Sequence, residues 1–213
     1  MKILVRSLFS VAVAAAMMAM SPLTHAELIT NGSFEDGEFV PDGNDLMSLP
    51  VGSMAIDGWV VTAAPIAWLG PANPWDVKAK AGNGDKFLDL TELVTNGPYG
   101  SLQQEISTVV GQEYTLSLDL GSSSSYNGSM NPNTGPEPTN VTVQAGETVT
   151  NFKSFVAGTG VNDWDSFSVN FEATSETTLV EISGFNGWNY IGLDNVSVVE
   201  VPEPSSIALA CCG

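Results

Sequence analysis

The sequence predicts an all-β fold, a sandwich of antiparallel strands, from three observations. Apolar residues alternate with polar ones over several short segments, as in Tyr114–Leu120 and Phe167–Phe171. Turn-forming pairs such as Asn31-Gly32 and Asn83-Gly84 separate the segments. After the N-terminal region no stretch has helical periodicity. A period of two marks strands with one buried face, and many short strands with Gly-rich and Asn-rich turns are typical of a sandwich.

The first 26 residues have the pattern of a secretory signal peptide. They are the first of three predicted segments of the chain, before a body and a tail. Lys2 and Arg6 precede an apolar run from Leu8 to Met20, and Thr24-His25-Ala26 offers small residues at a cleavage position. The run is shorter than the roughly 20 residues that a bilayer-spanning helix needs. We therefore expect cleavage after Ala26, an exported protein, and no transmembrane helix in the mature chain.

The charge of the chain limits its partners. The formal net charge is −18, and all 24 acidic residues follow the signal peptide. Removal of Lys2 and Arg6 makes the mature chain still more acidic. Such a surface repels phosphate backbones and anionic lipid head groups. We expect no nucleic-acid partner, and bound cations would relieve the repulsion.

The positions of histidine and cysteine exclude several chemistries. His25 leaves with the signal peptide, and Cys211 and Cys212 stand at the C-terminal end. The body of the chain therefore lacks the residues for Ser-His-Asp or Cys-His catalysis and for zinc sites built on His or Cys. Paired carboxylates, oxygen-ligated calcium and aromatic stacking surfaces remain as candidate site chemistries.

The body, residues 27–201, is predicted to be one β-sandwich domain followed by a tail at 202–213. Further strands are expected around Val141 and Val143 and around Val196 and Val198. Two segments rich in Gly, Pro and polar residues, Asp36–Met54 and Gly121–Thr139, are expected to be long loops.

Three motifs place this sandwich in a known class. Asn31–Glu35 (NGSFE), Gly58-Trp59 and Gly192–Val198 (GLDNVSV) resemble the carbohydrate-binding jelly-roll modules of the galactose-binding-like class. The resemblance implies a jelly-roll β-sandwich in which the first and last strands lie side by side.

The same resemblance implies a structural Ca²⁺ ion shared by Glu35 and Asp194, with Asp85 as a further ligand. Calcium takes six to eight oxygen ligands, which carboxylates and loop carbonyls can supply without histidine. The alternative is that these carboxylates cap turns or face water.

A narrower resemblance covers nearly the whole body. Ile56–Trp59, Ile66–Gly70, Phe87–Leu90, Leu102–Gln104 and Gly111–Leu116 resemble, in this order, the choice-of-anchor C group of exported bacterial proteins, close to the DUF642 family of plant cell-wall proteins. The likeness implies no enzymatic activity and a role in binding polysaccharide.

The tail carries a second resemblance. Val201–Ser206 (VPEPSS) is similar to the start of a PEP-CTERM sorting signal, which exosortase-type machinery processes in Gram-negative bacteria that make exopolysaccharide. The likeness implies an extracellular or cell-surface location. Only Ile207–Gly213 follow here, without a spanning stretch or an Arg cluster, so the signal is incomplete in this sequence.

Aromatic residues are the candidate ligand-binding groups, since their rings can stack on sugars. Trp59 stands in strand-like apolar sequence and is expected in the core, whereas Trp68 and Trp164 could be core or surface. Trp75, and Trp188 with Tyr190, stand in polar, turn-like sequence and are the candidates for a ligand platform. The alternative for them is that they anchor loops.

Three functions are compatible with these observations. The favoured one is a non-catalytic binding module for extracellular or envelope polysaccharide. The second is a structural surface or matrix protein without specific glycan recognition. The third is a carboxylate-based glycoside hydrolase, for which no motif singles out a catalytic pair among the 24 acidic residues.

Overall fold

The computed structural model describes residues 26–74, 84–92, 97–122, 130–131, 135–136, 139–154, 163–186 and 191–202. The secondary structure within these ranges consists of strands. Among these residues, no helix is both long and apolar enough to cross a membrane. The proposed signal peptide up to residue 25 and the tail beyond residue 202 lie outside the described residues.

Antiparallel strands form two large sheets and one short hairpin. The six-stranded sheet has the order β1 (Leu46–Leu49), β3 (Ile66–Leu69), β4 (Phe87–Asp89), β13 (Gly192–Glu200), β6 (Glu113–Ser122) and β11 (Asp163–Glu172). The five-stranded sheet has the order β10 (Thr148–Ser154), β9 (Thr139–Ala145), β12 (Thr177–Asn186), β5 (Ser101–Ser107) and β2 (Val60–Val61). The hairpin pairs β7 (Met130–Asn131) with β8 (Gly135–Pro136).

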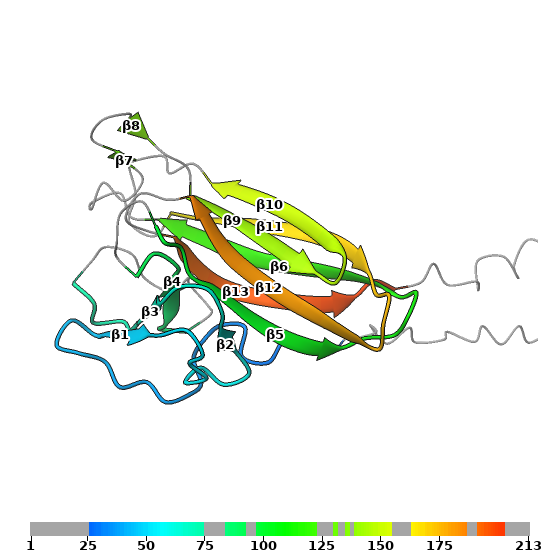
Figure 1. The fold of residues 1–213 in the computed structure, drawn as a ribbon, viewed down its shortest axis with the longest axis horizontal. Helices are drawn as coiled ribbons and strands as arrows, with labels where there is room; N and C mark the ends of the chain where they lie inside the picture. The colour runs from blue at the N-terminus through cyan, green and yellow to red at the C-terminus, as the bar shows by residue number, and fades with distance from the viewer. Residues whose placement is uncertain are drawn as a thin grey trace, which may run out of the picture.

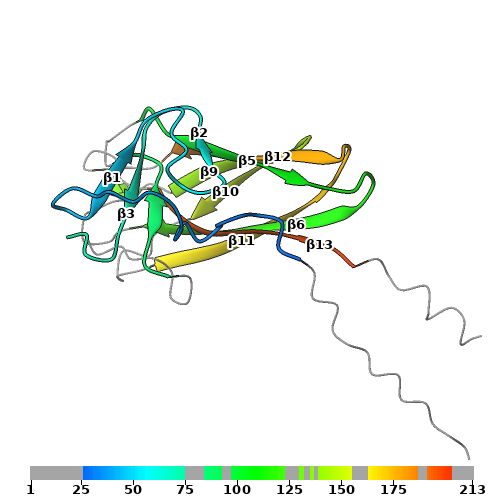
Figure 2. The same ribbon diagram turned by 90° about the horizontal axis from the view of Figure 1, so that it is seen from below.

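The two large sheets lie face to face and enclose the main core. Figure 1 looks onto the five-stranded sheet, and Figure 2 shows the two sheets as separate layers. Alternate residues of β6 and β12, such as Leu116, Leu118, Val180 and Ile182, are buried in this core. Burial of this apolar surface is the main driving force for the fold. The predicted all-β fold, a jelly-roll sandwich, is confirmed by this strand order.

The strands expected from alternating sequence are present as β6, β9, β11 and β13. Two strands instead are buried on both faces. All residues of β3 and β4 are buried, because Ala67, Leu69 and Phe87 form a second apolar cluster against which Trp164 packs. The rings of Phe87 and Trp164 meet edge to face, with centroids 5.8 Å apart.

The expectation of two long loops was wrong in part. Within Asp36–Met54 the structure contains β1, whose Leu49 is buried and pairs with Ile66 of β3. Within Gly121–Thr139 it contains β7 and β8, and β6 and β9 reach into the segment from either side. The prediction of loops relied on the Gly, Pro and polar content of both segments. Strand β1 forms despite this composition, because the neighbouring β3 supplies its hydrogen bonds.

Two tryptophans, Trp59 and Trp68, lie in the core. Trp59 is buried as predicted, and Trp68 is buried as well. Both indoles donate to the backbone near the chain start: Trp59 Nε1 to the carbonyl of Asn31 at 3.1 Å, and Trp68 Nε1 to that of Phe34 at 2.9 Å. Buried indoles thus help to position the NGSFE motif.

Candidate functional site

The opening segment of the body, residues 27–35, lies along β13. Leu28 N donates to Val198 O at 3.0 Å, and Val196 N donates to Gly32 O at 2.8 Å. The described chain therefore begins and ends at the same end of the sandwich, as Figures 1 and 2 show. The segment forms no strand of its own between residues 26 and 45. The prediction that the first and last strands lie side by side was therefore wrong for the strands, because β3 and β4 separate β1 from β13; the opening segment lies beside the last strand instead.

Gln104 and Glu27 hold this segment from two sides. The buried Gln104 side chain accepts from Thr30 N at 2.7 Å and donates to Thr30 O at 3.0 Å. Gln104 of β5 thus makes the same pair of hydrogen bonds to the segment that a neighbouring strand would make. The Glu27 carboxylate accepts from Ile29 N at 2.9 Å and Val198 N at 2.7 Å and from the Ser197 hydroxyl. The opening segment is thus tied to both sheets.

Asn31 and Gly32 have separate structural roles in the NGSFE motif. Asn31 has a φ of 54°, a conformation that Asn tolerates better than most residues. Its side chain accepts from Asp36 N at 3.0 Å and donates to Asp36 O at 2.8 Å and Asp57 O at 3.2 Å. A Cβ atom on Gly32 would lie 1.8 Å from Val196 O, so only glycine allows this approach of two backbones.

Glu35 fixes the turn that leads into β4. Its Oε1 accepts from Asp85 N at 2.8 Å and Lys86 N at 2.6 Å, and Lys86 Nζ lies 3.3 Å from Oε2. Lys86 Nζ also donates to Glu35 O at 2.9 Å. A Cβ atom on Gly84 would lie 2.3 Å from this carboxylate. The structure therefore brings together two of the predicted metal residues, Glu35 and Asp85, although Asp85 contributes its N–H to this contact.

Asp194 lies on β13, buried and opposite Asp119 of β6. Its Oδ1 accepts from Asn195 N at 2.7 Å, and Asn195 Nδ2 donates to Asp119 Oδ2 at 2.9 Å. Asn195 has a φ of 54° and stands where the register of β13 shifts. Asp194 and its neighbour Asn195 thus make the irregular part of β13 against which the opening segment packs.

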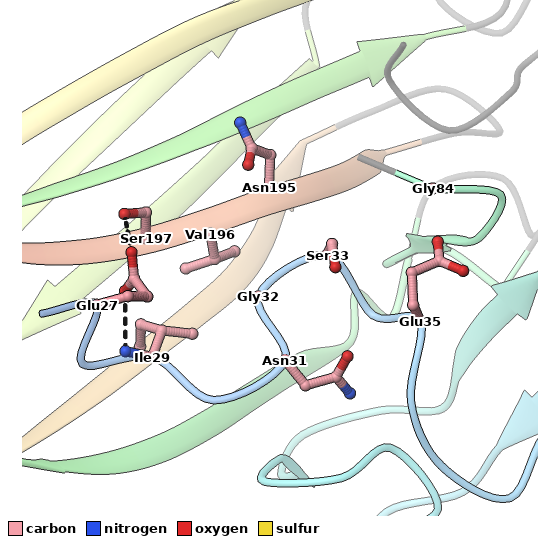
Figure 3. A pocket seen from close by; sticks show the side chains of 10 residues that line it. All are labelled: Glu27, Ile29, Asn31, Gly32, Ser33, Glu35, Gly84, Asn195, Val196 and Ser197. Carbon is pink, nitrogen blue, oxygen red and sulfur yellow. Dashed lines mark hydrogen bonds between the residues drawn. The ribbon is translucent and has the colours of Figure 1, made fainter. Parts of the chain in front are cut away.

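An open pocket lies between the opening segment and β13 (Figure 3). Its lining residues are Glu27, Ile29, Asn31, Gly32, Ser33, Glu35, Gly84, Asn195, Val196 and Ser197. In Figure 3 the Glu27 side chain is directed to Ser197, whereas Glu35 lies at the far end of the pocket beside Gly84. Among the residues that the structure describes, no group of three or more His, Cys, Asp or Glu side chains could hold a metal ion.

A second surface, on the five-stranded sheet, has the composition of a binding site. We call it the outer polar face. Its polar members are Gln103, Glu105, Thr142, Gln144, Asn151, Lys153, Glu181 and Ser183, and its apolar members are Val60, Val149, Leu179 and Phe185. They alternate with core residues such as Leu102, Val143 and Ile182, and successive side chains of a strand point to opposite faces. All are exposed or half-buried.

Register arranges the outer polar face in rows across the strands. Glu181 of β12 lies opposite Gln144 of β9 and Gln103 of β5. Ser183 lies opposite Thr142, which in turn lies opposite Asn151 of β10. The Thr142 hydroxyl donates to Asn151 Oδ1 at 2.7 Å. Amide, hydroxyl and carboxylate groups therefore stand side by side on neighbouring strands.

Phe185 is the aromatic residue of this face, and it was not among the aromatic residues predicted to bind a ligand. The register shifts between Gly184, which pairs with Val141, and Asn186, which pairs with Asn140, so Phe185 is the extra residue of a bulge. Bulges re-aim side chains, and Phe185 is 63% exposed. The sequence signal was its place in Gly184-Phe185-Asn186-Gly187, an aromatic between turn-forming residues. The candidates Trp75, Trp188 and Tyr190 lie outside the described residues.

The strand order of the two packed antiparallel sheets defines a jelly-roll β-sandwich. The chain itself belongs to the DUF642 family, described as a protein of unknown function, whose family model matches residues 27–188. A search of the curated proteins found no match.

Solved structures of similar fold include carbohydrate-binding modules. TmCBM61, solved in complex with β-1,4-galactotriose, is 14% identical over 83% of this chain and 99% of that chain, with a TM-score of 0.45. A family 35 module from Clostridium thermocellum is 9% identical over 74% of this chain and 94% of that chain, with a TM-score of 0.40. These similarities concern the fold.

Proposed function

We propose that this protein is a non-catalytic, exported module that binds extracellular or envelope polysaccharide. The observation that carries the proposal is the outer polar face, where an exposed aromatic ring stands on the same sheet face as rows of amide and hydroxyl groups. Sugar rings have apolar faces that stack on aromatic side chains and hydroxyls that hydrogen-bond to such polar groups. The DUF642 membership and the jelly-roll fold are compatible with this role.

Binding of the purified protein to a glycan array, followed by isothermal titration calorimetry, tests the proposal. We expect at least one polysaccharide from the matrix of the host organism to bind, and titration to give a saturable isotherm. Absence of binding to every matrix polysaccharide would reject the proposal and favour a scaffold role. Surface retention in a mutant that makes no exopolysaccharide would separate these two functions, because a scaffold would stay and a glycan reader would be lost.

Glycoside hydrolysis is the alternative function, because two carboxylates lie near each other on the outer polar face. Leu179 lies opposite Glu105, and Glu181 follows two residues later, so the two carboxylates are diagonal neighbours, about 7–8 Å apart between their Cα atoms. The general acid of a glycosidase is a carboxyl group held in an apolar pocket, whereas Glu105 is exposed. We expect no release of reducing sugar. Release that disappears in Glu181→Gln would establish the enzyme instead.

A structural calcium ion is the second part of the proposal, with Glu35 and Asp194 as ligands and Asp85 as a further one. Glu35 and Asn195 line one pocket, and Asp194 directly precedes Asn195 but is not itself a lining residue. The support for the assignment is therefore the proximity of β13 to Glu35. Lys86 Nζ, 3.3 Å from Glu35 Oε2, already neutralises this carboxylate and competes with a cation. Calcium binding therefore requires the ammonium group to move away.

Thermal unfolding with calcium or EDTA tests this site. A ligand that binds the folded state raises the melting temperature by mass action, so we expect a higher Tm in calcium than in EDTA and no difference in Asp194→Asn. Sodium chloride at matched ionic strength controls for screening of the acidic surface. An equal Tm in calcium and EDTA, measured after prolonged chelation, would leave Glu35 with the structural role described above.

The location and processing of the protein complete the proposal. The signal peptide, the PEP-CTERM-like tail and the choice-of-anchor C likeness support export to the surface of a Gram-negative bacterium, with processing by exosortase-type machinery if the tail is completed. Mass spectrometry of the mature protein would report the N-terminus, which we expect at Glu27.

A further inference from the structure

We propose that the ligand of the outer polar face is an uncharged polysaccharide, bound over a stretch of at least about three sugar units between Phe185 and the row Gln144–Glu181–Gln103. This inference rests on the proposed function and specifies its ligand class, its site and its dependence on chain length.

The row Gln144–Glu181–Gln103 supplies the hydrogen bonds. Its members lie directly opposite one another on three adjacent strands, and strands are spaced by about 4.8 Å. A sugar hydroxyl is both donor and acceptor, as are the two amides, while the carboxylate accepts. The Thr62 hydroxyl donates to Glu181 Oε1 at 3.3 Å and helps to orient it. The row therefore offers complementary partners for hydroxyls over the width of three strands.

Phe185 supplies the stacking surface at a distance from this row. It stands on the bulge of β12, and its side chain is 63% exposed. It stands four residues after Glu181, which at 3.2–3.4 Å per residue is roughly 13 Å along the strand. One sugar ring cannot reach both groups. An oligosaccharide that lies along β12 can, and it passes Ser183 on the way.

The charge of the surface selects among polysaccharides. The outer polar face has the carboxylates of Glu105 and Glu181 and the ammonium of Lys153, in a chain of formal net charge −18. A polyanionic chain is repelled by this field. A polycation is attracted to the whole acidic surface, and such attraction is screened by salt. Binding through amides, hydroxyls and one aromatic ring requires no ligand charge.

The experiment is calorimetric titration of the purified protein with polymers of each charge type. Galactan, xylan and mixed-linkage β-glucan serve as uncharged probes, polygalacturonate as the anionic one and chitosan as the cationic one, each in low and high salt. We expect saturable, salt-independent binding of an uncharged polymer. Its oligosaccharides should gain at least about tenfold in affinity between the single sugar and the trisaccharide, which spans both groups.

Variants locate the site. Phe185→Ala, and separately the double variant Gln103→Ala with Gln144→Ala, should weaken binding at least about tenfold. Met54→Ala, which trims a 73% exposed apolar side chain elsewhere, is the matched control and should bind as the wild type. Because all these side chains are at the surface, an unchanged Tm will show that the variants fold.

The outcomes separate the inference from the proposed function. Salt-independent binding of polygalacturonate alone, equal affinity for single sugars and trisaccharides, or wild-type affinity in the Phe185 and glutamine variants would overturn the inference and leave polysaccharide binding intact. Binding of chitosan alone that is lost in high salt would overturn it as charge attraction. Absence of binding to all probes and to the host's matrix polysaccharides would reject the proposed function with it.

Discussion

Gly32 shows how one residue type can be required by a close approach between two backbones. A side chain there would meet the carbonyl of Val196, with the Cβ atom only 1.8 Å from the oxygen. Relief requires the opening segment to move off β13, which breaks the hydrogen bond from Val196 N to Gly32 O. The motif glycine is therefore part of the contact that closes the sandwich.

Gly32→Ala should accordingly destabilise the protein strongly, by on the order of 3 kcal/mol, in the range for substitutions that strain the packed fold. Urea unfolding followed by tryptophan fluorescence measures the loss. Gly43→Ala is the control, because a Cβ atom at Gly43 would meet nothing within 4 Å. Equal stability of the two variants would show that the approach at Gly32 is looser than described.

Gln104 provides a second prediction at this scale. Gln104→Ala removes both partners of the Thr30 backbone, and unpaired buried polar groups cost about 1–3 kcal/mol. We expect a fall in unfolding free energy of that size, measured in urea. Gln103→Ala, its exposed-face neighbour on β5, should leave stability unchanged; a comparable loss in that variant would contradict the assignment of faces in β5.

At the scale of elements, the opening segment is held by backbone hydrogen bonds to β13, by its own Glu27 side chain and by Gln104 from the other sheet. Glu27 accepts the N–H groups of Ile29 and Val198, which would otherwise be edge donors. β4 pairs with β13 only at Gly192 and Leu193, so the rest of this side of β13 would be open to pairing with other chains if it were not covered. The opening segment thus serves as the cover of β13 at this end of the sheet.

Glu27→Ala should loosen that cover locally. Without the carboxylate, the amides of Ile29 and Val198 lose their acceptor, so we expect both to exchange hydrogen faster through local opening. The amides of β9 and β12 should keep their protection. Two-dimensional NMR exchange spectra provide the measurement. Protection that falls uniformly over both sheets would indicate instead that the segment is integral to the global fold.

At the scale of the whole molecule, acidity dominates. With a formal net charge of −18, self-repulsion disfavours the compact state and salt screens it. We therefore expect the Tm at neutral pH to rise when sodium chloride is increased from about 0.01 M to about 0.15 M, over which the Debye length falls from about 30 to about 8 Å. Differential scanning fluorimetry in sodium chloride, with potassium chloride as a second monovalent salt, measures this. A Tm that falls with salt would show that attractive pairs such as Lys86–Glu35 outweigh the repulsion.

Alternation along the chain was sufficient to predict the strands that have one buried face, because period-two patterning depends only on neighbouring residues. It could not reveal β1, whose polar surroundings resemble a loop, or the two-sided burial of β3 and β4, which depends on Phe87 meeting Trp164 across the sheet.

The sequence by itself determined the fold class, the acidity and the absence of histidine and cysteine from the body, since these follow from composition and local pattern. Tertiary structure alone decided that Glu35 contacts Asp85 and Lys86, and that Glu181 stands between two glutamines with Phe185 exposed beyond them. Those neighbours are far apart in the chain, and strand register, which brings them together, is set by the packing of the entire core.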